Sequence, residues 1–452
     1  MILPLLLTSI FFAEAQPPAT EIVKPQEVRP LPGELDNIPV FNSNSPELIL
    51  SEGILLSTFP PENKNNPEAH LNFAFEGRFD LFAHHVAKPP EPEDLRTLYL
   101  GILVHNPNDK PVTVNILQAA SYLSQPDAPF IELPAVVENP EGRVYAGPGS
   151  RVMNDILRGK RQDIFPKKIV IPPEESRMLL NAPIPVRSLE PPLNGRSTYM
   201  RLESNGEVYV ASLAKYARTE PNGNEPSPSL SEWNNLLKTG KLSTPRDRPP
   251  TPPNTETNQI IYGRVAGVAR GSVWNADLVD NAGGSHLTIP QPGEAFSYGI
   301  STLPKGQLGT DQTQSAEMLV RYPDTAYKAH GNYGVQYSLD LPLYNPTNQT
   351  QTVVLTVQTP LKEDELSQNG LRFLDPPAPQ TFFRGTVRFR YIDDGGNRQT
   401  RYFHLVQKRG QMGEPLVKLE IEPQERRQVE FDFIYPPDAS PPQVLTVQTL
   451  EE

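Results

Sequence analysis

Proline constrains this chain more than any other residue, because it occurs 52 times among 452 residues. A proline ring removes a backbone N–H donor and breaks the interior of a helix. The frequency is roughly twice the usual share, which disfavours helical bundles, coiled coils and Rossmann-type enzymes with long helices. Hydrophobic residues make up 37% of the chain and come in short alternating runs, the pattern of half-buried strands.

An internal repeat gives the clearest indication of the architecture. Residues 98–116 and 337–355 both alternate apolar and polar side chains on either side of an Asn-Pro pair, which is Asn106-Pro107 in the first copy. A second pair of similar segments, 169–177 and 419–427, follows in the same order. Strand, Asn-Pro turn, strand is the pattern of a hairpin with one buried face. The sequence therefore predicts an all-β fold with two immunoglobulin-like antiparallel β-sandwich modules.

The chain divides by composition into five segments. They are a signal peptide at 1–15, an extended N-terminal arm at 16–69, a first β-sandwich module at 70–216, a Pro-rich linker at 217–258, and a second module at 259–450. The linker ends in a stiff proline-rich spacer. Before that spacer, Ser229 to Gly240 has the cap, apolar stripe and stop of a short helix, and a second short helix is predicted at 150–158.

The first residues predict secretion. Residues 2–12 form an apolar run that is too short to cross a membrane, and Ala13-Glu14-Ala15 follows as a small-x-small cleavage signature. A buried N-terminal strand is the alternative interpretation. No later run approaches the length of a membrane span. We therefore expect a protein that is secreted or periplasmic and does not span the membrane.

The absence of cysteine and the acidic charge exclude whole classes of chemistry. Without cysteine the chain has no disulfides, cysteine-zinc sites, iron–sulfur clusters or thiol catalysis. The formal net charge of −12 disfavours nucleic acid as a partner, because such binding needs a basic surface. No phosphate-binding loop, zinc-protease motif or serine-hydrolase motif is present. The sequence predicts no catalytic residue and no cofactor.

Five segments with distinctive residue patterns resemble one known family. They are 34–46 (ELDNIPVFNSNSP), 145–151 (YAGPGSR), 246–253 (RDRPPTPP), 262–268 (YGRVAGV) and 330–335 (HGNYGV). They resemble a cyanobacterial family catalogued as domain of unknown function 3370, over nearly all the mature chain. The resemblance implies a secreted or envelope protein of a cyanobacterium, and it implies no activity and no site residues.

A tyrosine-bearing segment is the candidate binding site. Residues 321–335 are polar, contain glycine and precede the repeated strand of the second module. Tyrosine rings stack on sugar faces, while Asp and Asn side chains hydrogen-bond to hydroxyls. The alternative is a loop that folds back on its own sandwich. The candidate ligand-binding residues are Tyr322, Asp324, Tyr327, His330, Asn332 and Tyr333.

Two other clusters invite a metal interpretation. His84 and His85 are adjacent, but neighbouring side chains on a strand point to opposite faces, so the pair cannot chelate one ion. Asp393 and Asp394 offer oxygen ligands for calcium, although a hairpin tip explains the same residues. The sequence therefore predicts no metal site.

These observations favour a non-catalytic protein with a binding or structural role at the cell envelope or in extracellular polysaccharide. An envelope protein is another possible partner. The first alternative is a secreted polysaccharide or peptidoglycan hydrolase that uses two carboxylates. The second is an envelope metal-binding protein, which requires His84 or His85 to meet His70 or His105 in space.

Overall fold

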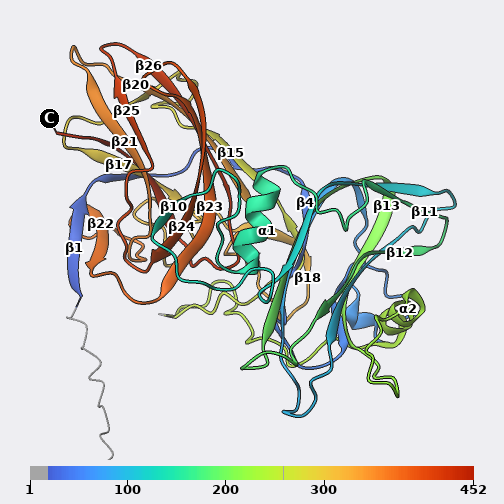
Figure 1. Ribbon diagram of the computed structural model, residues 1–452. Helices are drawn as coiled ribbons and strands as arrows, with labels where there is room; N and C mark the ends of the chain where they lie inside the picture. Colours follow the sequence, from blue (N-terminus) through green and yellow to red (C-terminus); the bar gives the residue numbers. More distant parts are fainter. Residues whose placement is uncertain (1–18, 258, 452) are drawn as a thin grey trace, which may run out of the picture.

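The computed structural model describes residues 19–257 and 259–451, and strands dominate it (Figure 1). The predicted all-β class is confirmed, since the described residues form several sheets and only two α-helices. The predicted signal peptide at 1–15 lies outside the described residues. In the described part of the chain, no helix is long and apolar enough to cross a membrane.

A twelve-stranded sheet holds most of the first half of the chain. Its main path is β11 (Lys168–Ile171), β9 (Val112–Leu123), β13 (Asn194–Tyr216), β7 (Phe75–Ala87), β4 (Pro39–Ser43), β14 (Ala266–Arg270), β18 (Ala316–Arg321) and β19 (Lys328–Ala329). Off this path lie β5 (Leu48–Ile49), β6 (Gly53–Ser57), β8 (Leu98–His105) and β12 (Ser176–Ile184).

The long strand β13 divides this sheet into two layers. Its first part pairs with β7 and β9, and its last part pairs with β6 and β8, which continues to β12. The register with β7 shifts between Ser204 and Val208, where the change of partners begins. Side chains of both layers form one core that includes Phe79, Leu100 and Leu202.

Two further sheets enclose a second core. The eight-stranded sheet runs β10 (Val136–Glu138), β24 (Arg398–Lys408), β23 (Thr381–Ile392), β26 (Arg426–Ile434), β20 (Gln336–Tyr344), β15 (Val273–Asp277) and β3 (Glu34–Leu35), with β16 (Leu287–Thr288) beside β20. The five-stranded sheet runs β2 (Glu27–Arg29), β17 (Ala295–Ile300), β27 (Gln443–Thr449), β21 (Gln351–Gln358) and β25 (Val417–Ile421). Tyr337, Phe389 and Leu445 meet between them. A separate pair is formed by β1 (Thr20–Pro25) and β22 (Gly370–Asp375).

The sequence repeat corresponds to a repeat of strand pairs. We call the part built on the twelve-stranded sheet the first half and the part built on the eight- and five-stranded sheets the second half. In the first half β8 pairs with β12 and β9 pairs with β11. In the second half β20 pairs with β26 and β21 pairs with β25. Both copies contain an Asn-Pro turn between the two repeated strands. Both turn asparagines, Asn106 and Asn345, are fully buried.

Each of these asparagines ties its turn to the distant segment of the same repeat. The Nδ2 of Asn106 donates to the carbonyl four residues later at 2.7 Å and to the Ile171 carbonyl at 3.0 Å. The Nδ2 of Asn345 makes the same two bonds, to the carbonyl four residues later and to Ile421, both at 2.8 Å. The two copies therefore share the hydrogen bonds that hold the second sequence marker against the first.

Strand pairing crosses the predicted domain boundaries. The predicted arm at 16–69 supplies β2 and β3 to the sheets of the second half, and β4, β5 and β6 to those of the first. The strand β14 comes from the predicted second module but lies between β4 and β18 in the twelve-stranded sheet. Conversely, β10 comes from the predicted first module but pairs with β24. The predicted division at 70–216 and 259–450 therefore does not describe the sheets. Apolar alternation shows which face of a strand is buried but not which strand lies beside it.

Both predicted helices form, and one of them lies between the two halves. Helix α2 (Leu230–Thr239) begins with a capping box of Ser229 and Glu232, and its Trp233 is fully buried. Helix α1 (Pro148–Leu157) contacts β9 and β13 on one side and β23 and β26 on the other (Figure 1). Gly149 allows this approach, because a Cβ atom there would lie 2.3 Å from the ring of Pro437.

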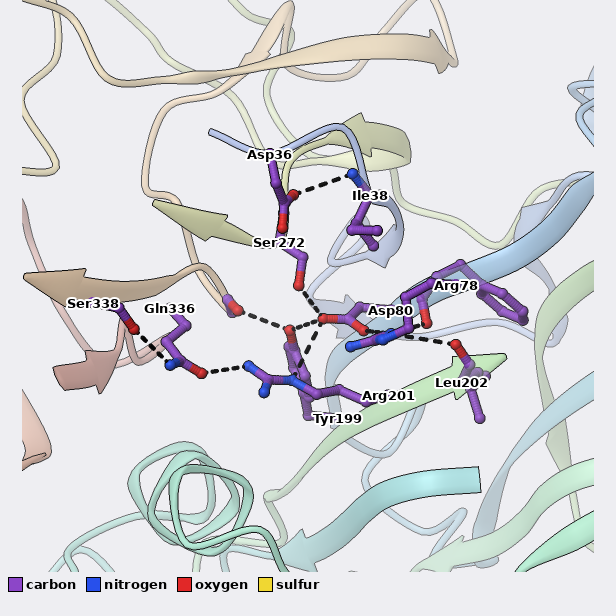
Figure 2. Close-up of polar contacts among 12 residues, drawn as sticks. Asp36, Ile38, Arg78, Asp80, Tyr199, Arg201, Leu202, Ser272, Gln336 and Ser338 are labelled. Atoms are coloured by element: carbon purple, nitrogen blue, oxygen red, sulfur yellow. Dashed lines mark hydrogen bonds and ion pairs between the residues drawn. The ribbon is translucent and has the colours of Figure 1, made fainter. Parts of the chain in front are cut away.

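A fully buried carboxylate joins the two halves (Figure 2). Asp80 on β7 accepts hydrogen bonds from the Tyr199 hydroxyl at 2.6 Å, from the Ser272 hydroxyl and from the Arg78 guanidinium. Arg78 and Tyr199 come from strands of the first half, whereas Ser272 directly precedes β15 in the eight-stranded sheet. The charge of Asp80 is therefore solvated by groups from both halves.

A second chain of polar contacts runs beside it. Arg201 on β13 lies 3.8 Å from the Asp80 carboxylate and donates to the side-chain oxygen of Gln336 on β20 at 2.6 Å. Gln336 in turn donates to Ser338 at 2.8 Å, as Figure 2 shows, and Ser338 donates to Asp432 on β26 at 2.9 Å. These contacts fix the twelve-stranded sheet against the eight-stranded sheet.

Replacing either turn asparagine by alanine should destabilise the fold. Asn106→Ala and Asn345→Ala each leave buried carbonyl groups without a donor, so each should lower the free energy of unfolding by about 1–3 kcal/mol. Urea unfolding followed by circular dichroism measures the change. The exposed Asn65→Ala is the control and should leave stability unchanged. Wild-type stability of both turn variants would contradict the role of these bonds.

Replacing Asp80 by asparagine should cost more. The variant removes the negative charge that the half-buried Arg78 faces, and loss of one member of a fully buried ion pair costs about 3–5 kcal/mol, which is the upper bound here. Thermal unfolding of Asp80→Asn, compared with the exposed Asp163→Asn, tests this. If both variants unfold at the wild-type temperature, the Asp80 contacts do not hold the halves together.

Candidate functional site

The tyrosine-bearing segment 321–335 connects the two halves of the protein. It runs from the end of β18 through β19 to the start of β20, so it leaves the twelve-stranded sheet and enters the eight-stranded one. The structure places its six predicted site residues in two groups. His330, Asn332 and Tyr333 line a cavity, whereas the other three do not.

Tyr322, Asp324 and Tyr327 are held by neighbouring groups. Tyr322 is fully buried, and its hydroxyl donates to a backbone carbonyl at 2.7 Å and accepts from a backbone N–H at 3.0 Å. Asp324 forms an ion pair with Arg246 at 2.7 Å. The Arg321 guanidinium lies 3.9 Å from the centroid of the Tyr327 ring. All three side chains are therefore engaged within the fold.

The cavity lies where separate parts of the chain meet, and its volume is about 350 Å³. Its position follows from strand pairing, because β4, the segment before β14 and the connection from β19 to β20 come together there. Its walls are formed by Asn42, Asn44, residues 262–265, Leu303, residues 329–333, Lys362, Phe382 and residues 440–441.

His330 presents a neutral imidazole to the cavity. Its Nδ1 lies 2.9 Å from the Ser315 hydroxyl oxygen, and its ring meets the Tyr262 ring at 60° with 5.1 Å between centroids. Burial, with a smaller contribution from the nearby cations Lys328 and Lys362, lowers the pKa of His330 to about 4. At neutral pH this side chain therefore acts as an aromatic ring and a neutral hydrogen-bonding group.

Tyr333 supplies a second ring, and Asn332 shapes the loop. The Tyr333 hydroxyl donates to the Ala439 carbonyl at 2.9 Å, and burial raises the pKa of Tyr333 to about 12. The Asn332 amide accepts from the Ala316 N–H at 3.1 Å and donates to the Gln314 carbonyl at 2.7 Å. The polar atoms of Asn332 are thus occupied, and Tyr333 offers its ring.

Two residues of the cavity wall, Asn42 and Asn44, carry a side-chain amide oxygen without a hydrogen-bond partner. Asn42 lies on β4 and Asn44 directly follows it, so strand alternation places both on one side. The two residues are 4% and 3% exposed, and neither Oδ1 atom has a partner among the described residues. An unsatisfied buried polar group costs about 1–3 kcal/mol. A ligand that carries hydroxyl groups would relieve that cost.

Two cations also line the cavity, and they differ in their partners. Arg264 forms ion pairs with Glu47 and, at 3.5 Å, with Asp247. The Lys362 ammonium lies 2.5 Å from the Tyr262 hydroxyl and 4.4 Å from the centroid of its ring. Desolvation of the ammonium group lowers the pKa of Lys362 to about 8. The residues of the wall therefore provide aromatic rings, two unpartnered amide oxygens and one cation without a carboxylate at ion-pair distance among the described residues.

The histidines of the metal hypothesis are held by separate partners. His84 Nδ1 lies 2.7 Å from the Ser197 hydroxyl, and both ring nitrogens of His85 lie 2.9 Å from oxygens, of Ser43 and Pro46. Across residues 19–257 and 259–451, no group of three or more His, Asp or Glu side chains is placed to hold a metal ion.

The aspartates at 393–394 form the predicted hairpin tip between β23 and β24. Asp393 accepts from the Asn397 N–H at 2.8 Å, and Asp394 forms an ion pair with Arg427 at 3.2 Å. Both carboxylates therefore have hydrogen-bond or ion-pair partners within the protein.

A second cavity of about 230 Å³ is acidic and lies on the eight-stranded sheet. Asp340 on β20 lies directly opposite Asp277 on β15 and Glu430 on β26. Burial raises the pKa of Asp340, and the negative charges of Glu430, Asp277 and Asp432 raise it further, while Arg390 opposes them. This row of like charges is unfavourable for the fold, since like charges on facing strand positions repel.

Asp340→Asn should therefore stabilise the protein at neutral pH. The folded state binds the Asp340 proton more tightly than the unfolded chain, so the carboxylate costs stability at pH values above its folded pKa. That cost disappears below the unfolded pKa of about 3.9. We expect a rise in melting temperature of about 1–3 °C at neutral pH and none near pH 3. A lower melting temperature at neutral pH would show that Asp340 stabilises the fold.

Several cavity residues were not predicted from the sequence. Tyr262, Asn42 and Asn44 lie in the segments 262–268 and 34–46 that carry the family resemblance, but no local pattern connects those segments to each other. Lys362 follows β21 in a polar connection and carries no signal of its own. Only long-range strand pairing brings these side chains to His330.

Comparison with known proteins leads to one family. No curated protein matches the chain. The family described as "Protein of unknown function (DUF3370)" has a model that matches residues 26–449, nearly the whole chain. This match confirms the resemblance that the five distinctive segments indicated, and the chain belongs to the DUF3370 family of proteins of unknown function.

Proposed function

We propose that this protein is a non-catalytic binding or structural protein of the cell envelope or extracellular matrix, associated with polysaccharide. The observation that carries the proposal is the cavity beside Tyr262, His330 and Tyr333, where the amide oxygens of the lining residues Asn42 and Asn44 lack partners. Rings that offer an apolar face next to unsatisfied polar groups are the usual composition of a ligand site.

A sugar satisfies both features of this cavity. The C–H faces of a pyranose ring pack against aromatic rings, and its hydroxyls donate to amide oxygens. The neutral state of His330 and Tyr333, which follows from their shifted pKa values, keeps charge away from that packing surface. The cavity is at the small end of the roughly 300–1,000 Å³ usual for ligand sites, so it suits a single sugar unit of a longer chain.

The location and the finer fold class belong to the same proposal. The apolar run and cleavage signature at 1–15 support secretion to the periplasm or beyond, and the family resemblance supports a cyanobacterial envelope. The repeated strand pairs around Asn106 and Asn345 support two immunoglobulin-like modules that exchange edge strands. Such modules serve as scaffolds for many binding sites, which is support by analogy alone.

Co-sedimentation tests the binding role. The mature chain is mixed with isolated cell wall or with exopolysaccharide, and pelleted protein and released sugar are measured in the same tubes. We expect pelleting without released product, and at least a tenfold weaker association of the Asn42→Ala/Asn44→Ala double variant. Tyr327→Ala is the matched control, since this tyrosine lies in the same segment but does not line the cavity. Equal pelleting of the double variant and wild type would exclude the cavity as the site.

The acidic cavity favours one alternative, a hydrolase of polysaccharide or peptidoglycan. Such an enzyme needs a protonated carboxylic acid beside a second carboxylate, and Asp340 between Asp277 and Glu430 has the raised pKa that suits the acid. Release of soluble sugar or peptide that Asp340→Asn abolishes would establish this alternative. Release that Asp340→Asn leaves unchanged would exclude this carboxylate row as its site.

A further inference from the structure

The cation of Lys362 is the polar feature of the cavity that neutral sugar binding leaves unused. The Tyr262 hydroxyl donates to the Pro304 carbonyl, so it accepts one N–H of the Lys362 ammonium. An ammonium group has three N–H donors. Within the described residues, Lys362 makes no other side-chain hydrogen bond and no ion pair. Lys362 is exposed, so two of its donors have no protein partner and can bind a ligand at the cavity.

The surroundings of Lys362 favour an anion there. The negative charge of Asp364 raises the pKa of Lys362, against the effect of desolvation, but Asp364 forms its ion pair with Lys305, at 3.8 Å. The other cation of the wall, Arg264, is already neutralised by Glu47 and Asp247. A cation without a carboxylate partner gains most from a ligand that brings its own negative charge.

The amides of Asn42 and Asn44 define the rest of the ligand. They line the same cavity as Lys362, and their unpartnered oxygens need donors rather than a second anionic group. Tyr262, His330 and Tyr333 add ring surfaces, which need an apolar face. The ligand should therefore combine hydroxyl donors, a ring with an apolar face and one carboxylate.

We propose that the cavity binds an acidic sugar, a hexuronate unit, with its carboxylate on Lys362 and its hydroxyls on Asn42 and Asn44. This inference rests on the proposed sugar-binding function and adds the class of sugar to it. The overall charge of −12 repels a polyanion, so recognition of the acidic unit depends on this local cation.

A matched pair of ligands tests the inference. Methyl β-D-glucuronide carries a carboxylate where methyl β-D-glucoside carries a hydroxymethyl group, and the two are otherwise identical. Calorimetry measures the affinity of the full mature chain for each. We expect at least tenfold tighter binding of the glucuronide. Lys362→Gln should bring the two affinities to the same value, and Lys362→Arg should keep the preference for the glucuronide.

The nearby Lys328→Gln is the control. Lys328 is exposed on β19, next to the cavity residue Ala329, but it does not line the cavity, so the preference should survive its replacement. Unfolding curves confirm that each variant folds, and Lys362→Met serves as a second charge-removing variant. A preference for glucuronide that Lys362→Gln and Lys362→Met both abolish supports the inference.

Three outcomes overturn it, and they differ in their meaning for the proposed function. Equal affinity of the wild-type protein for both glycosides excludes the acidic sugar but leaves sugar binding in place. Binding of neither glycoside, together with failure of the wild-type protein to pellet with polysaccharide, excludes both proposals. A glucuronide preference that Lys362→Gln leaves intact places the carboxylate elsewhere and also overturns the inference.

Discussion

The buried charge of Asp80 sets the relation between the two halves of this protein. A carboxylate without solvent is costly unless several donors surround it. Here Arg78 and Tyr199 come from the twelve-stranded sheet and Ser272 from the segment that enters the eight-stranded one. Separating the halves would leave the charge with only part of its donors. The contact between the halves therefore stabilises the buried charge of the twelve-stranded sheet.

The candidate cavity depends on that contact, because its walls come from both halves. Asn42 belongs to a strand of the twelve-stranded sheet, while Phe382 belongs to β23 in the eight-stranded one. His330 and Tyr333 lie on the connection between the two sheets. A small rotation of one half against the other would change the distance between the free amides and the aromatic rings. The polar network thus positions the site without touching a ligand.

The sequence predicted local features well and long-range ones poorly. The cap and apolar stripe of α2 and the repeated hairpins depend on neighbouring residues, and the structure contains both. The pairing of β4 with β14 depends on backbone groups more than two hundred residues apart, as Val40 opposite Ala269 shows. The same limit applies to the site: the tyrosine-bearing segment was recognised, but Asn42 and Lys362 reach it only through tertiary structure. Tyrosine and aspartate were chosen for their chemistry, and burial decided which of them face the cavity.

The N-terminal arm supplies strands to all four sheets of the described chain, and this has a consequence for how the chain folds. Glu27 lies opposite Phe296 and Thr20 lies opposite Asp375, so these early strands pair only after their distant partner strands have been synthesised. Contacts of such high sequence separation form slowly, and unpaired strands expose edges that aggregate. The chain has no cysteine, so no disulfide can hold a partly folded state together. The partly folded chain must therefore stay soluble through its composition. Its 52 prolines and its excess of acidic residues interrupt and repel intermolecular strand pairing, so the composition that limits the fold also protects the chain until the fold is complete.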